Sequence, residues 1–542
     1  MSELIADIVR GAVERRREEG LVTVQELPPV QVERPRREEF GDYATNIAML
    51  VGAREGVQPR KIAEAIAGPI GEHPLVTRVE VAGPGFINIT MDRSYWMELL
   101  RDAVSQGNRY GRTGTGGGKR VLIEYVSANP TGPLHIGHGR GAAFGDSLAN
   151  VLDAAGYDVT REFYINDAGS QVKNLAESIM LKVREKRGEV VEWGDNHYRG
   201  EYIGRLAAEV VEEEAVEDIG SEALKEMLEW IRRDLSDFNI RFDNWFSESG
   251  LYREGKVERL VDELKGRGHV EEREGAVWFR STEFGDDKDR VVIRESGEPT
   301  YFASDIAYHF DKYERGFDSL INIWGADHHG YIPRIKAVVQ ALGHDKDSLK
   351  VILAQMVTVL RGGKPVTMSK RSGEYITLRD VLDEVGSDAT RFFFMMRKPD
   401  AQMEFDLDLA KKQAPENPVY YLQYAHARIC SIIDFAGEKG LNISETGEAD
   451  LDRLDLKEEL DIIRHIASFP EMVRGAALSL EPHRITFYLQ ELAGKFHPYY
   501  NRNRIVTDDT ALTAARLYLC SAIQVVLRNG LALLGVSAPE KM

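Results

Sequence analysis

The strongest constraint on the fold is an apolar strand that runs directly into a turn rich in glycine and histidine. The strand pattern covers residues 120–127, a helical pattern follows from about Ile136 to Gly156, and a second strand pattern begins at Tyr157. A strand, a helix and a strand within this length form a parallel βαβ unit. We therefore predict an α/β fold built on a parallel sheet.

The turn between the first strand and the helix has the composition of an anion site. In an open parallel sheet, ligands bind at the carboxyl ends of strands, beside helix N-termini. We expect the helix to point unpaired N–H groups at that position. Three glycines there would let a bulky anion approach the backbone: Gly132, Gly137 and Gly139. His135 and His138 are one helical turn apart, so both imidazoles can face one ligand and stabilise charge on a phosphate. The residues predict nucleotide or phosphate binding and leave the reaction open.

Overall composition excludes few functions. A length of 542 residues suggests roughly three or four domains. A net charge of -19 argues against bulk, non-specific binding of polyanions but allows a local basic groove. We expect no membrane-spanning segment and no secretory leader, and hence a cytoplasmic protein. Cys430 and Cys520 are the two cysteines of the sequence, which is too few for a disulfide framework or a cysteine-based zinc site.

Composition shifts divide the chain into three parts. A glycine-rich linker at 113–120 follows a mixed α and β region. A charged, helix-rich stretch occupies about 168–268, and strand patterns then resume in "AVWFR", "RVVIR", "TYFASDIAYH" and "DSLINIWGADHHG". From about Ala389 onward, apolar residues recur at helical spacing, which predicts a separate helical domain.

Two motifs resemble the signatures of class I aminoacyl-tRNA synthetases. "HIGH" at His135–His138 resembles the first signature, and its wider form "SANPTGPLHIGH" is similar to the arginyl-tRNA synthetase version. "VTMSKRSG" resembles the second, a lysine loop, with Thr367 in place of its first lysine and Arg371 in place of its final serine. Lys370 keeps the position of the functional lysine, which the resemblance implies binds the pyrophosphate leaving group, and Lys364 is a candidate to supplement it.

The resemblance to arginyl-tRNA synthetases extends along nearly the whole chain. "EEFGDYATNIAM" and "GPGFINI" resemble their N-terminal extension, and "SDATRFFF" at 387–394 resembles the DALR signature with Thr390 in place of leucine. The resemblance implies three domains. These are an N-terminal α+β domain at 1–112 that contacts the tRNA elbow, a Rossmann-like catalytic domain at 119–385 with a helical insertion, and a helical anticodon-binding domain at 386–542.

The resemblance also implies an arginine pocket. Arginine is a planar cation with five donors, so its pocket should contain carboxylates, which would reject lysine and citrulline. Glu124 and Asp305 match the positions that hold the substrate side chain, with Tyr301 beside the guanidinium. The implied arginine-binding set is Glu124, Ser127, Asn129, His135, Tyr301 and Asp305.

For ATP, which is expected as its Mg²⁺ complex, the implied contacts follow the two motifs and the strand ends. The set is Pro133, Gly137, His138, Gly325, Asp327, His329, Met356, Val357, Ser369 and Lys370. His328, His329 and Asp327 could instead suggest a metal, but adjacent side chains do not all point one way, so we prefer nucleotide contact. His135, His138 and Lys370 are the implied catalytic residues: the arginine carboxylate attacks the α-phosphate, and the tRNA 2′-hydroxyl then attacks the adenylate.

Contacts with the tRNA are expected mainly in the helical domain. The segment 495–504 interleaves aromatic residues with arginines, which suits stacking on unpaired bases with phosphate contacts nearby. The expected contacts are Asn88 at the elbow and Tyr424, Arg428, Tyr499 and Arg502 elsewhere, with His426 in the second cluster. The family resemblance implies that arginine activation requires tRNA, and a monomer is expected.

Three other functions stay open at this stage. One is a class I synthetase for another amino acid such as cysteine, which the missing zinc cysteines disfavour. A second is a small-molecule nucleotidyltransferase, which has no need of a helical anticodon domain. A third is a non-catalytic RNA-binding paralogue, which the intact His135, His138 and Lys370 disfavour.

Overall fold

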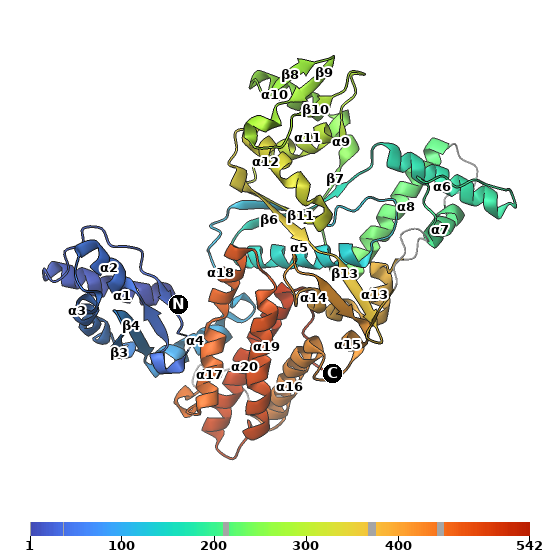
Figure 1. Cartoon of the computed structure of the whole chain (residues 1–542). Coiled ribbons are helices and arrows are strands. Elements are labelled where there is room, and N and C mark those ends of the chain that lie inside the picture. The colour runs from blue at the N-terminus through green and yellow to red at the C-terminus, as the bar shows by residue number, and fades with distance from the viewer. Residues whose placement is uncertain (1, 36, 210–215, 367–374, 442–448) are drawn as a thin grey trace. The chain divides into compact units, whose positions relative to one another are not determined.

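The computed structural model describes residues 2–35, 37–209, 216–366, 375–441 and 449–542 (Figure 1). The chain forms two compact units. The first contains Met1–Tyr110, Ile429–Glu471 and Gly494–Val526, and the second contains Gly111–Arg428, Met472–Ala493 and Leu527–Met542. The expected bounds of the three domains stay a prediction, because the compact units divide the C-terminal helices between them.

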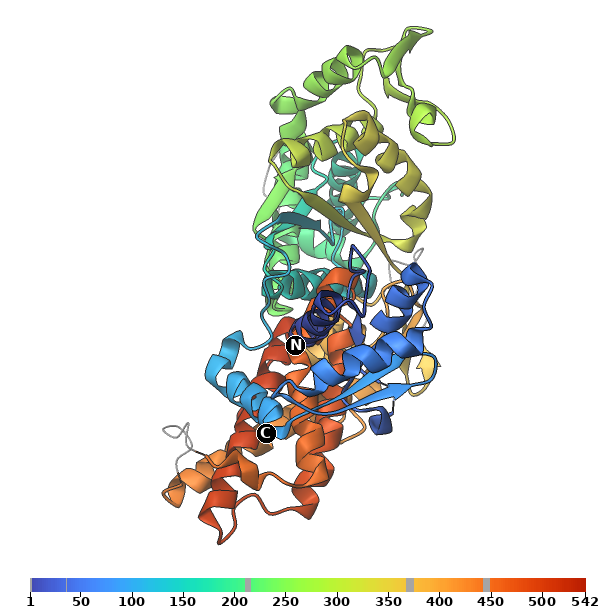
Figure 2. The same cartoon turned by 90° about the vertical axis from the view of Figure 1, so that its left-hand side faces the viewer.

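The N-terminal part of the first unit is a four-stranded antiparallel sheet with helices packed beside it (Figures 1 and 2). The strand order is β1-β2-β4-β3. The elements are α1 (Ser2–Glu18), β1 (Val32–Glu33), β2 (Tyr43–Thr45), α2 (Ile47–Glu55), α3 (Pro59–Gly71), β3 (Val76–Ala82), β4 (Phe86–Met91) and α4 (Arg93–Gln106). This is the mixed α and β architecture that the sequence predicts for this region.

Helix α4 packs along α17 (Lys457–Ala467), so the N-terminal fold and part of the helical region share one compact unit. A buried carboxylate organises the helices there. Glu459 accepts from Arg516 Nε at 3.0 Å and from the Tyr499 hydroxyl at 2.8 Å, which ties α17 to α19 (Arg484–Arg502) and α20 (Thr510–Leu533). The remaining C-terminal helices are α16 (Pro418–Glu438) and α18 (Phe469–Ser479).

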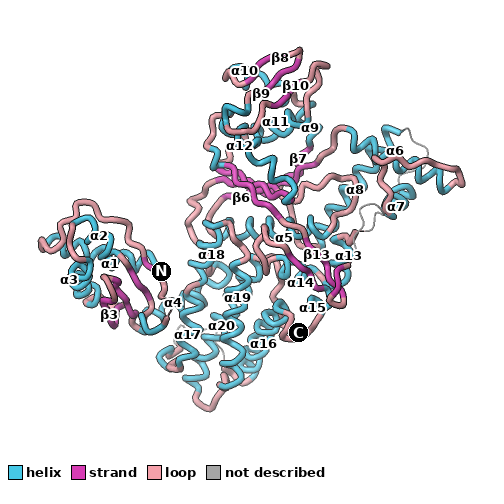
Figure 3. Tube along the Cα trace, viewed as in Figure 1, coloured by secondary structure: helices cyan, strands magenta, loops and turns pink. Residues whose placement is uncertain are grey.

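The second unit is built on a five-stranded parallel sheet in the order β12-β11-β5-β6-β7 (Figure 3). The strands are β5 (Arg120–Glu124), β6 (Asp158–Ile165), β7 (Asn244–Ser247), β11 (Ser319–Gly325) and β12 (Leu349–Ala354). Helix α5 (Ile136–Ala154) connects β5 to β6 and packs on the sheet, which confirms the predicted βαβ unit. Because β5 pairs with β6 on one side and β11 on the other, the strand order reverses beside β5, where open sheets bind ligands.

The stretch 168–268 is helical, as expected, but it also contains β7, the edge strand of the parallel sheet. A four-residue strand is too short to stand out by periodicity among helices. The helices are α6 (Ser170–Lys186), α7 (Glu201–Glu209), α8 (Val216–Asp237), α9 (Glu248–Arg253) and α10 (Lys256–Gly266). A three-stranded antiparallel sheet follows, with β8 (Val270–Arg273), β9 (Ala276–Phe279) and β10 (Arg290–Ile293).

One strand prediction is wrong. The segment "TYFASDIAYH" forms helix α11 (Tyr301–Glu314) and not a strand. The Thr300 side chain accepts from Ala303 N and caps the helix, while Phe302, Ala303, Ile306 and Ala307 are buried at helical spacing. Aromatic and β-branched content suggested a strand, but the cap and the period of the buried residues decide the helix.

The rest of the second unit lies outside the parallel sheet. Its elements are η4 (Ala326–Tyr331), α12 (Ile332–Ala341), β13 (Val357–Arg361), β14 (Lys364–Pro365), α13 (Leu378–Val385), α14 (Ser387–Phe394), β15 (Met403–Asp406) and α15 (Leu407–Lys411).

Helix α20 is long and apolar enough to cross a membrane by composition, contrary to the expectation of no membrane-spanning segment. Of its most apolar window, 67% is buried inside the protein, as in a core helix.

Candidate active site

A cleft of about 1570 Å³ opens at the carboxyl ends of β5, β11 and β12, beside the start of α5. Its wall comes from residues 126–141, the η4 turn, the β12–β13 connection and the segment 195–202, which ends in the first turn of α7. The cleft brings together eleven of the predicted contacts, namely Ser127, Asn129, Pro133, His135, Gly137, His138, Gly325, Asp327, His329, Met356 and Val357. Residues 195–202 were not predicted to belong to the site, because nothing in their pattern separates them from a solvated loop.

The two histidines of the turn form a reciprocal cap on α5. His135 is the N-cap residue, and its Nδ1 accepts from the N–H groups of Gly137 at 3.1 Å and His138 at 3.3 Å. In return, His138 Nδ1 accepts from His135 N at 3.3 Å. The rings are stacked with centroids 3.6 Å apart. Because both Nδ1 atoms accept, the ring protons lie on Nε2, which leaves each Nε2 as a donor.

This cap corrects the expectation of free amides at the helix start. The first two N–H groups after Ile136 donate to the His135 ring, and Ile136 N donates to Ile376 O at 3.3 Å. Any anion in the cleft therefore meets imidazole donors and the helix dipole first, not a row of unpaired amides. Burial lowers the pKa of His138 to about 3, with a further contribution from neighbouring His135, so His138 is neutral at physiological pH.

The backbone after β5 is held in an uncommon conformation. Val126 and Ser127 have φ values of 67° and 40°, in the left-handed region that β-branched residues rarely adopt. Such strain clusters at functional sites, where the surrounding structure enforces it. Here the Ser127 hydroxyl donates to Glu124 Oε1 at 3.0 Å and accepts from Tyr164 N at 3.1 Å, which holds the turn against the sheet.

Glu124 ends β5 as a buried carboxylate that already has an internal cation. The Lys312 ammonium, which is fully buried, donates to Glu124 Oε2 at 2.6 Å and to Asn322 Oδ1 at 3.1 Å. The same ammonium lies 4.1 Å from the centroid of the Tyr308 ring. The predicted burial of Glu124 is confirmed, but its nearest cation belongs to the protein, and no sequence pattern links Lys312 to it.

Asp305 and Glu248 lie near this pair and lack a close cation of their own in the described part of the chain. Asp305 accepts from the Tyr331 hydroxyl, and Glu248 is 3% exposed. Burial, together with the charges of Glu248 and Glu124, raises the pKa of Asp305 to about 7. Burial also raises the pKa of Glu248. Both shifts indicate that the surrounding protein supplies too little positive charge to keep both buried carboxyls ionised.

Glu248 and Tyr331 are residues that the sequence analysis missed. Glu248 begins α9 within a helix-rich stretch where a carboxylate normally belongs to a solvated face. Tyr331 ends η4, and only the fold brings it to Asp305 on α11. Tyr301, which was predicted beside the guanidinium, begins α11 with 59% of its surface exposed and packs against Gly169.

The predicted nucleotide contacts on the opposite wall are open to the cleft. The Asp327 side chain is 82% exposed and lies 3.7 Å from His328 Nε2. Met356 is 66% exposed, whereas Val357 at the start of β13 is buried. A Cβ on Gly325 would come close to Asp327 Oδ1, the end of an exposed side chain that can turn away.

The lysine loop lies outside the described residues. This applies to the predictions for Thr367, Ser369, Lys370 and Arg371. Lys364 is exposed in β14. The chain that follows the loop is hydrogen-bonded to the histidine turn. Leu378 N donates to Leu134 O at 2.7 Å, and the backbones of His135 and Thr377 form an antiparallel β-bridge.

The predicted tRNA contacts separate into accessible and buried residues. Arg428 stacks over the half-buried Tyr424 ring at 4.6 Å, and the Arg502 side chain is 71% exposed. Asn88 is 7% exposed but lines a second cavity of about 320 Å³ in the N-terminal fold. The structure corrects the prediction for Tyr499. This residue is 1% exposed and its hydroxyl donates to Glu459, so its ring cannot stack on a base.

His426 is likewise buried in the structure. Its Nδ1 lies 2.9 Å from Pro539 O, in the C-terminal tail, and burial lowers its pKa. The sequence placed it in a surface cluster because it lies between Tyr424 and Arg428, but the helix turns it toward the tail.

A parallel sheet with a histidine-capped helix at its switch point, followed by an all-helical region, defines a class I aminoacyl-tRNA synthetase. Comparison with known families agrees with this class. The model described as "tRNA synthetases class I (R), catalytic domain" matches residues 99–414, "Arginyl tRNA synthetase N terminal domain" matches 3–91, and "DALR anticodon binding domain" matches 422–542. The chain belongs to the arginyl-tRNA synthetase family.

Individual relatives agree along the full length. The arginine–tRNA ligase of Syntrophotalea carbinolica is 53% identical over 95% of both chains. A solved structure titled as a putative arginyl-tRNA synthetase of Campylobacter jejuni is 39% identical, with a TM-score of 0.77 over 83% of this chain and all of that one. The arginyl-tRNA synthetase of Thermus thermophilus, 22% identical, shares the fold with a TM-score of 0.78 over all of both chains.

The activity follows from the family. The enzyme joins L-arginine to tRNA(Arg) at the expense of ATP, and arginine, ATP and tRNA are its substrates. The rival predictions, a cysteine enzyme, a small nucleotidyltransferase and a non-catalytic paralogue, are not supported.

Proposed function

We propose that the cleft binds ATP, as its Mg²⁺ complex, against the His135–His138 pair. The observation that carries this proposal is the reciprocal cap, which fixes both rings in the lining of the cleft and places the ring protons on Nε2. Fixed neutral donors need little reorganisation when charge develops on the α-phosphate and the departing pyrophosphate. Gly325, Asp327, His329 and Met356 are proposed to contact the ribose and the adenine, with Pro133, Gly137 and Val357 as neighbouring walls.

The arginine side chain is proposed to bind between Asp305 and Glu248. The Lys312 ammonium already balances Glu124, so the unbalanced charge belongs to the other two carboxylates. A guanidinium presents a planar fork of donors that can satisfy both, while a lysine ammonium cannot span them in the same geometry. Ser127, Asn129 and His135 are proposed to hold the amino and carboxylate end of arginine, and Tyr301 to close over the side chain.

The reaction needs positioning and charge stabilisation without an enzyme nucleophile. A carboxylate oxygen of arginine attacks the α-phosphorus in line, the bond to the bridging oxygen of pyrophosphate breaks, and arginyl-adenylate forms. His135 and His138 stabilise the phosphate charge, with Ser369 and Lys370 as further contacts on the leaving group. The 2′-hydroxyl of the terminal adenosine then attacks the carbonyl carbon and AMP leaves.

We further propose where the chain contacts tRNA, where in the cell it acts and what its oligomeric state is. The N-terminal fold, 1–112, is proposed to receive a tRNA group in the cavity that Asn88 lines, and the helices of 386–542 to contact the anticodon arm through Arg428, Tyr424 and Arg502. A cytoplasmic monomer with no membrane attachment is proposed, and sedimentation of the purified chain tests the oligomeric state.

Calorimetric titrations with ATP and with arginine, in the presence of tRNA(Arg), test the two half-sites separately. His138→Ala should weaken the response to ATP and spare that to arginine, while Asp305→Asn should do the reverse. If both variants bind both ligands as the unchanged enzyme does, the proposed sites are wrong.

A further inference from the structure

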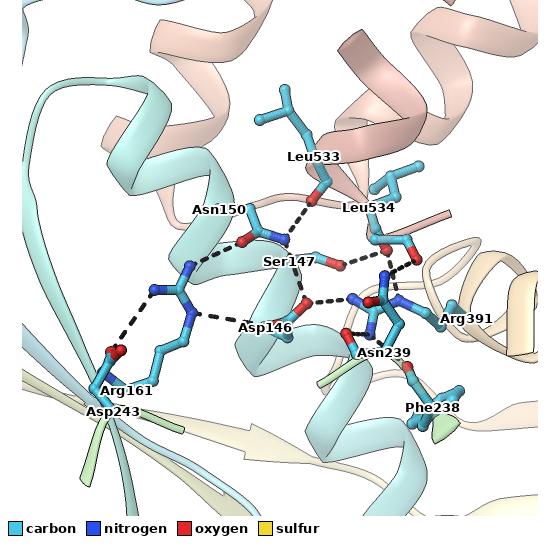
Figure 4. A network of polar contacts seen from close by, with 11 residues as sticks. Asp146, Ser147, Asn150, Arg161, Phe238, Asn239, Asp243, Arg391, Leu533 and Leu534 are labelled. Carbon is cyan, nitrogen blue, oxygen red and sulfur yellow. Dashed lines mark hydrogen bonds and ion pairs between the residues drawn. The ribbon is translucent and has the colours of Figure 1, made fainter. Parts of the chain in front are cut away.

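Helix α5 carries the two catalytic imidazoles at its first turn, so its position along its own axis sets where their donors point. A shift of about 1 Å in a catalytic group can cost roughly a hundredfold in rate. Something outside the cleft must therefore fix α5. The structure contains a buried polar network on the side of α5 that faces α14 and the C-terminal tail (Figure 4).

Arg391 on α14 is the centre of this network. It is fully buried, and its Nη2 donates to Asp146 of α5 at 2.5 Å. Its Nε donates to Leu534 O at 2.8 Å, and its Nη1 donates to Phe238 O at 3.0 Å. One guanidinium thus joins α5, α14, the turn after α8 and the chain just after α20, by using several donors of its planar fork.

The neighbouring residues of α5 support the same junction. Ser147 donates to Leu534 O at 3.4 Å, and Asn150 donates to both Asp146 and Leu533 O. Arg161 of β6 donates to Asn150 Oδ1 at 2.8 Å, as Figure 4 shows. The sheet, α5 and the tail are therefore held by one continuous set of hydrogen bonds.

The chain closes tightly over Arg391. Gly535 has φ +67°, and a Cβ there would come 2.2 Å from Arg391 Nη2. The Asn239 side chain donates to Gly535 O at 3.1 Å, which fastens the tail on the other side of the guanidinium. Both the space and the backbone conformation require glycine at this position.

A second contact between α5 and its supports lies next to the catalytic residues. A Cβ on Gly139, directly after His138, would come 2.7 Å from Leu378 Cδ1 and 3.4 Å from Phe394 Cε2 of α14. Gly139 and Asp146 are seven residues apart, so they face the same side of α5. Helix α14 therefore contacts α5 at both ends of a two-turn span, and the nearer contact adjoins His138.

We propose that Arg391 and Asp146 are positioning residues for the nucleotide site. Through their ion pair, and through the packing at Gly139, α14 fixes the axial position of α5 and so places the imidazoles of His135 and His138. This inference rests on the proposed nucleotide site. It assigns the DALR-like segment a part in arginine activation that is separate from any contact with tRNA.

The test measures ATP–pyrophosphate exchange with saturating tRNA(Arg). The double variant Arg391→Met, Asp146→Leu replaces the buried pair by apolar side chains of similar size, a change that buried pairs often tolerate in stability. We expect kcat to fall at least about tenfold with a smaller change in KM for arginine, because the two carboxylates proposed to hold its side chain lie on α9 and α11. Cooperative thermal unfolding should be retained.

Two single variants decide the matter if the double variant does not fold. Arg391→Lys keeps the charge but cannot reach all the acceptors at once, and Gly139→Ala pushes α5 away from Leu378. Each should lower kcat by a larger factor than it raises KM for arginine. Arg464→Met is the control, because it removes an arginine from an ion pair with the half-buried Asp42, 2.9 Å away, in the first compact unit. Its kcat should stay within about twofold.

His138→Ala, measured in the same assay, separates the two proposals. If it reacts at the normal rate, the proposed nucleotide site is wrong. If it is slow while the folded double variant, or both single variants, keep the normal kcat, then the pair is only structural and the positioning role is overturned.

Discussion

His138 combines structure and chemistry in one side chain. Its Nδ1 accepts from the N–H of His135, which places the ring proton on Nε2, and the residue lines the cleft. A buried imidazolium would carry a permanent desolvation cost, which the lowered pKa of this residue avoids. The residue type therefore suits an anion that gains charge only during the reaction.

We expect His138→Ala to lower kcat of ATP–pyrophosphate exchange by about a hundredfold or more, the range for loss of one preorganised donor. The lost cap should cost about 1 kcal/mol in the free energy of unfolding, measured by urea denaturation. His344→Ala is the control, because that ring stacks on Tyr313, 3.9 Å between centroids, and does not line the cleft. An unchanged kcat for His138→Ala would contradict the assignment.

Asp305 predicts a pH dependence of arginine binding. Its pKa is raised to about 7, so the carboxyl gains a proton as pH falls below 7, and a protonated carboxyl loses the charge that holds a guanidinium. KM for arginine should therefore rise as pH falls from 8 to 6. KM for ATP should change much less over the same pH range. Because this pKa lies above the ordinary value of 3.8, the ligand-free fold loses stability as pH rises from about 4 to about 7, and arginine should raise Tm more at pH 8 than at pH 6.

The variant Asp305→Asn should remove this pH dependence and raise KM for arginine by about ten- to a hundredfold, as expected for a lost charged hydrogen bond. Steady-state kinetics at several pH values measure both effects. If KM for arginine of the unchanged enzyme does not vary with pH, a group other than Asp305 binds the guanidinium.

At the scale of elements, the junction of β5 and α11 depends on an internal ion pair. Lys312 is fully buried and holds Glu124 at the end of β5. We expect Lys312→Met to lower the free energy of unfolding by about 3–5 kcal/mol, because it leaves a buried carboxylate without its cation. Chemical denaturation measures this loss.

Lys256→Met is the matched comparison on α10. Lys256 lies 2.7 Å from Asp311 of α11, but Asp311 keeps Arg315 at 2.9 Å after the change, and the Lys256 side chain is 21% exposed. The loss there should be about 1 kcal/mol or less. If both variants lower the free energy of unfolding equally, the Lys312–Glu124 ion pair contributes no more to stability than the Lys256–Asp311 pair.

At the scale of the whole molecule, the net charge of -19 means that tRNA binding depends on local contacts against an unfavourable background. Arg502→Ala should raise KM for tRNA a few-fold and reduce the dependence of log KM on log salt by about one unit of slope, as for one lost phosphate contact. KM for arginine should not change.

Tyr499→Phe supplies the contrast within the same helix. Tyr499 is buried and donates to Glu459, so its change should lower stability and leave KM for tRNA alone. If Tyr499→Phe raises KM for tRNA and Arg502→Ala does not, the accessible face of α19 has been assigned wrongly.

The sequence alone determined the βαβ unit, the helical C-terminal region, the family and many of the residues that line the cleft. These follow from local patterns: the period of apolar residues and a turn whose glycines and histidines are adjacent in the chain. His135, His138 and Asp327 could be predicted to share a cleft because they lie in the turns and helix starts that follow β5 and β11, where parallel sheets bind ligands.

The tertiary structure alone decided which charges balance one another and which groups remain accessible. Lys312 beside Glu124, Tyr331 on Asp305, Glu248 in the pocket and Arg391 on Asp146 join segments far apart in the chain, and no local period encodes such pairs. The same holds for the histidine cap that occupies the amides of α5 and for the burial of Tyr499. Pairing and burial are properties of packed elements, so they appear only when distant parts of the chain meet.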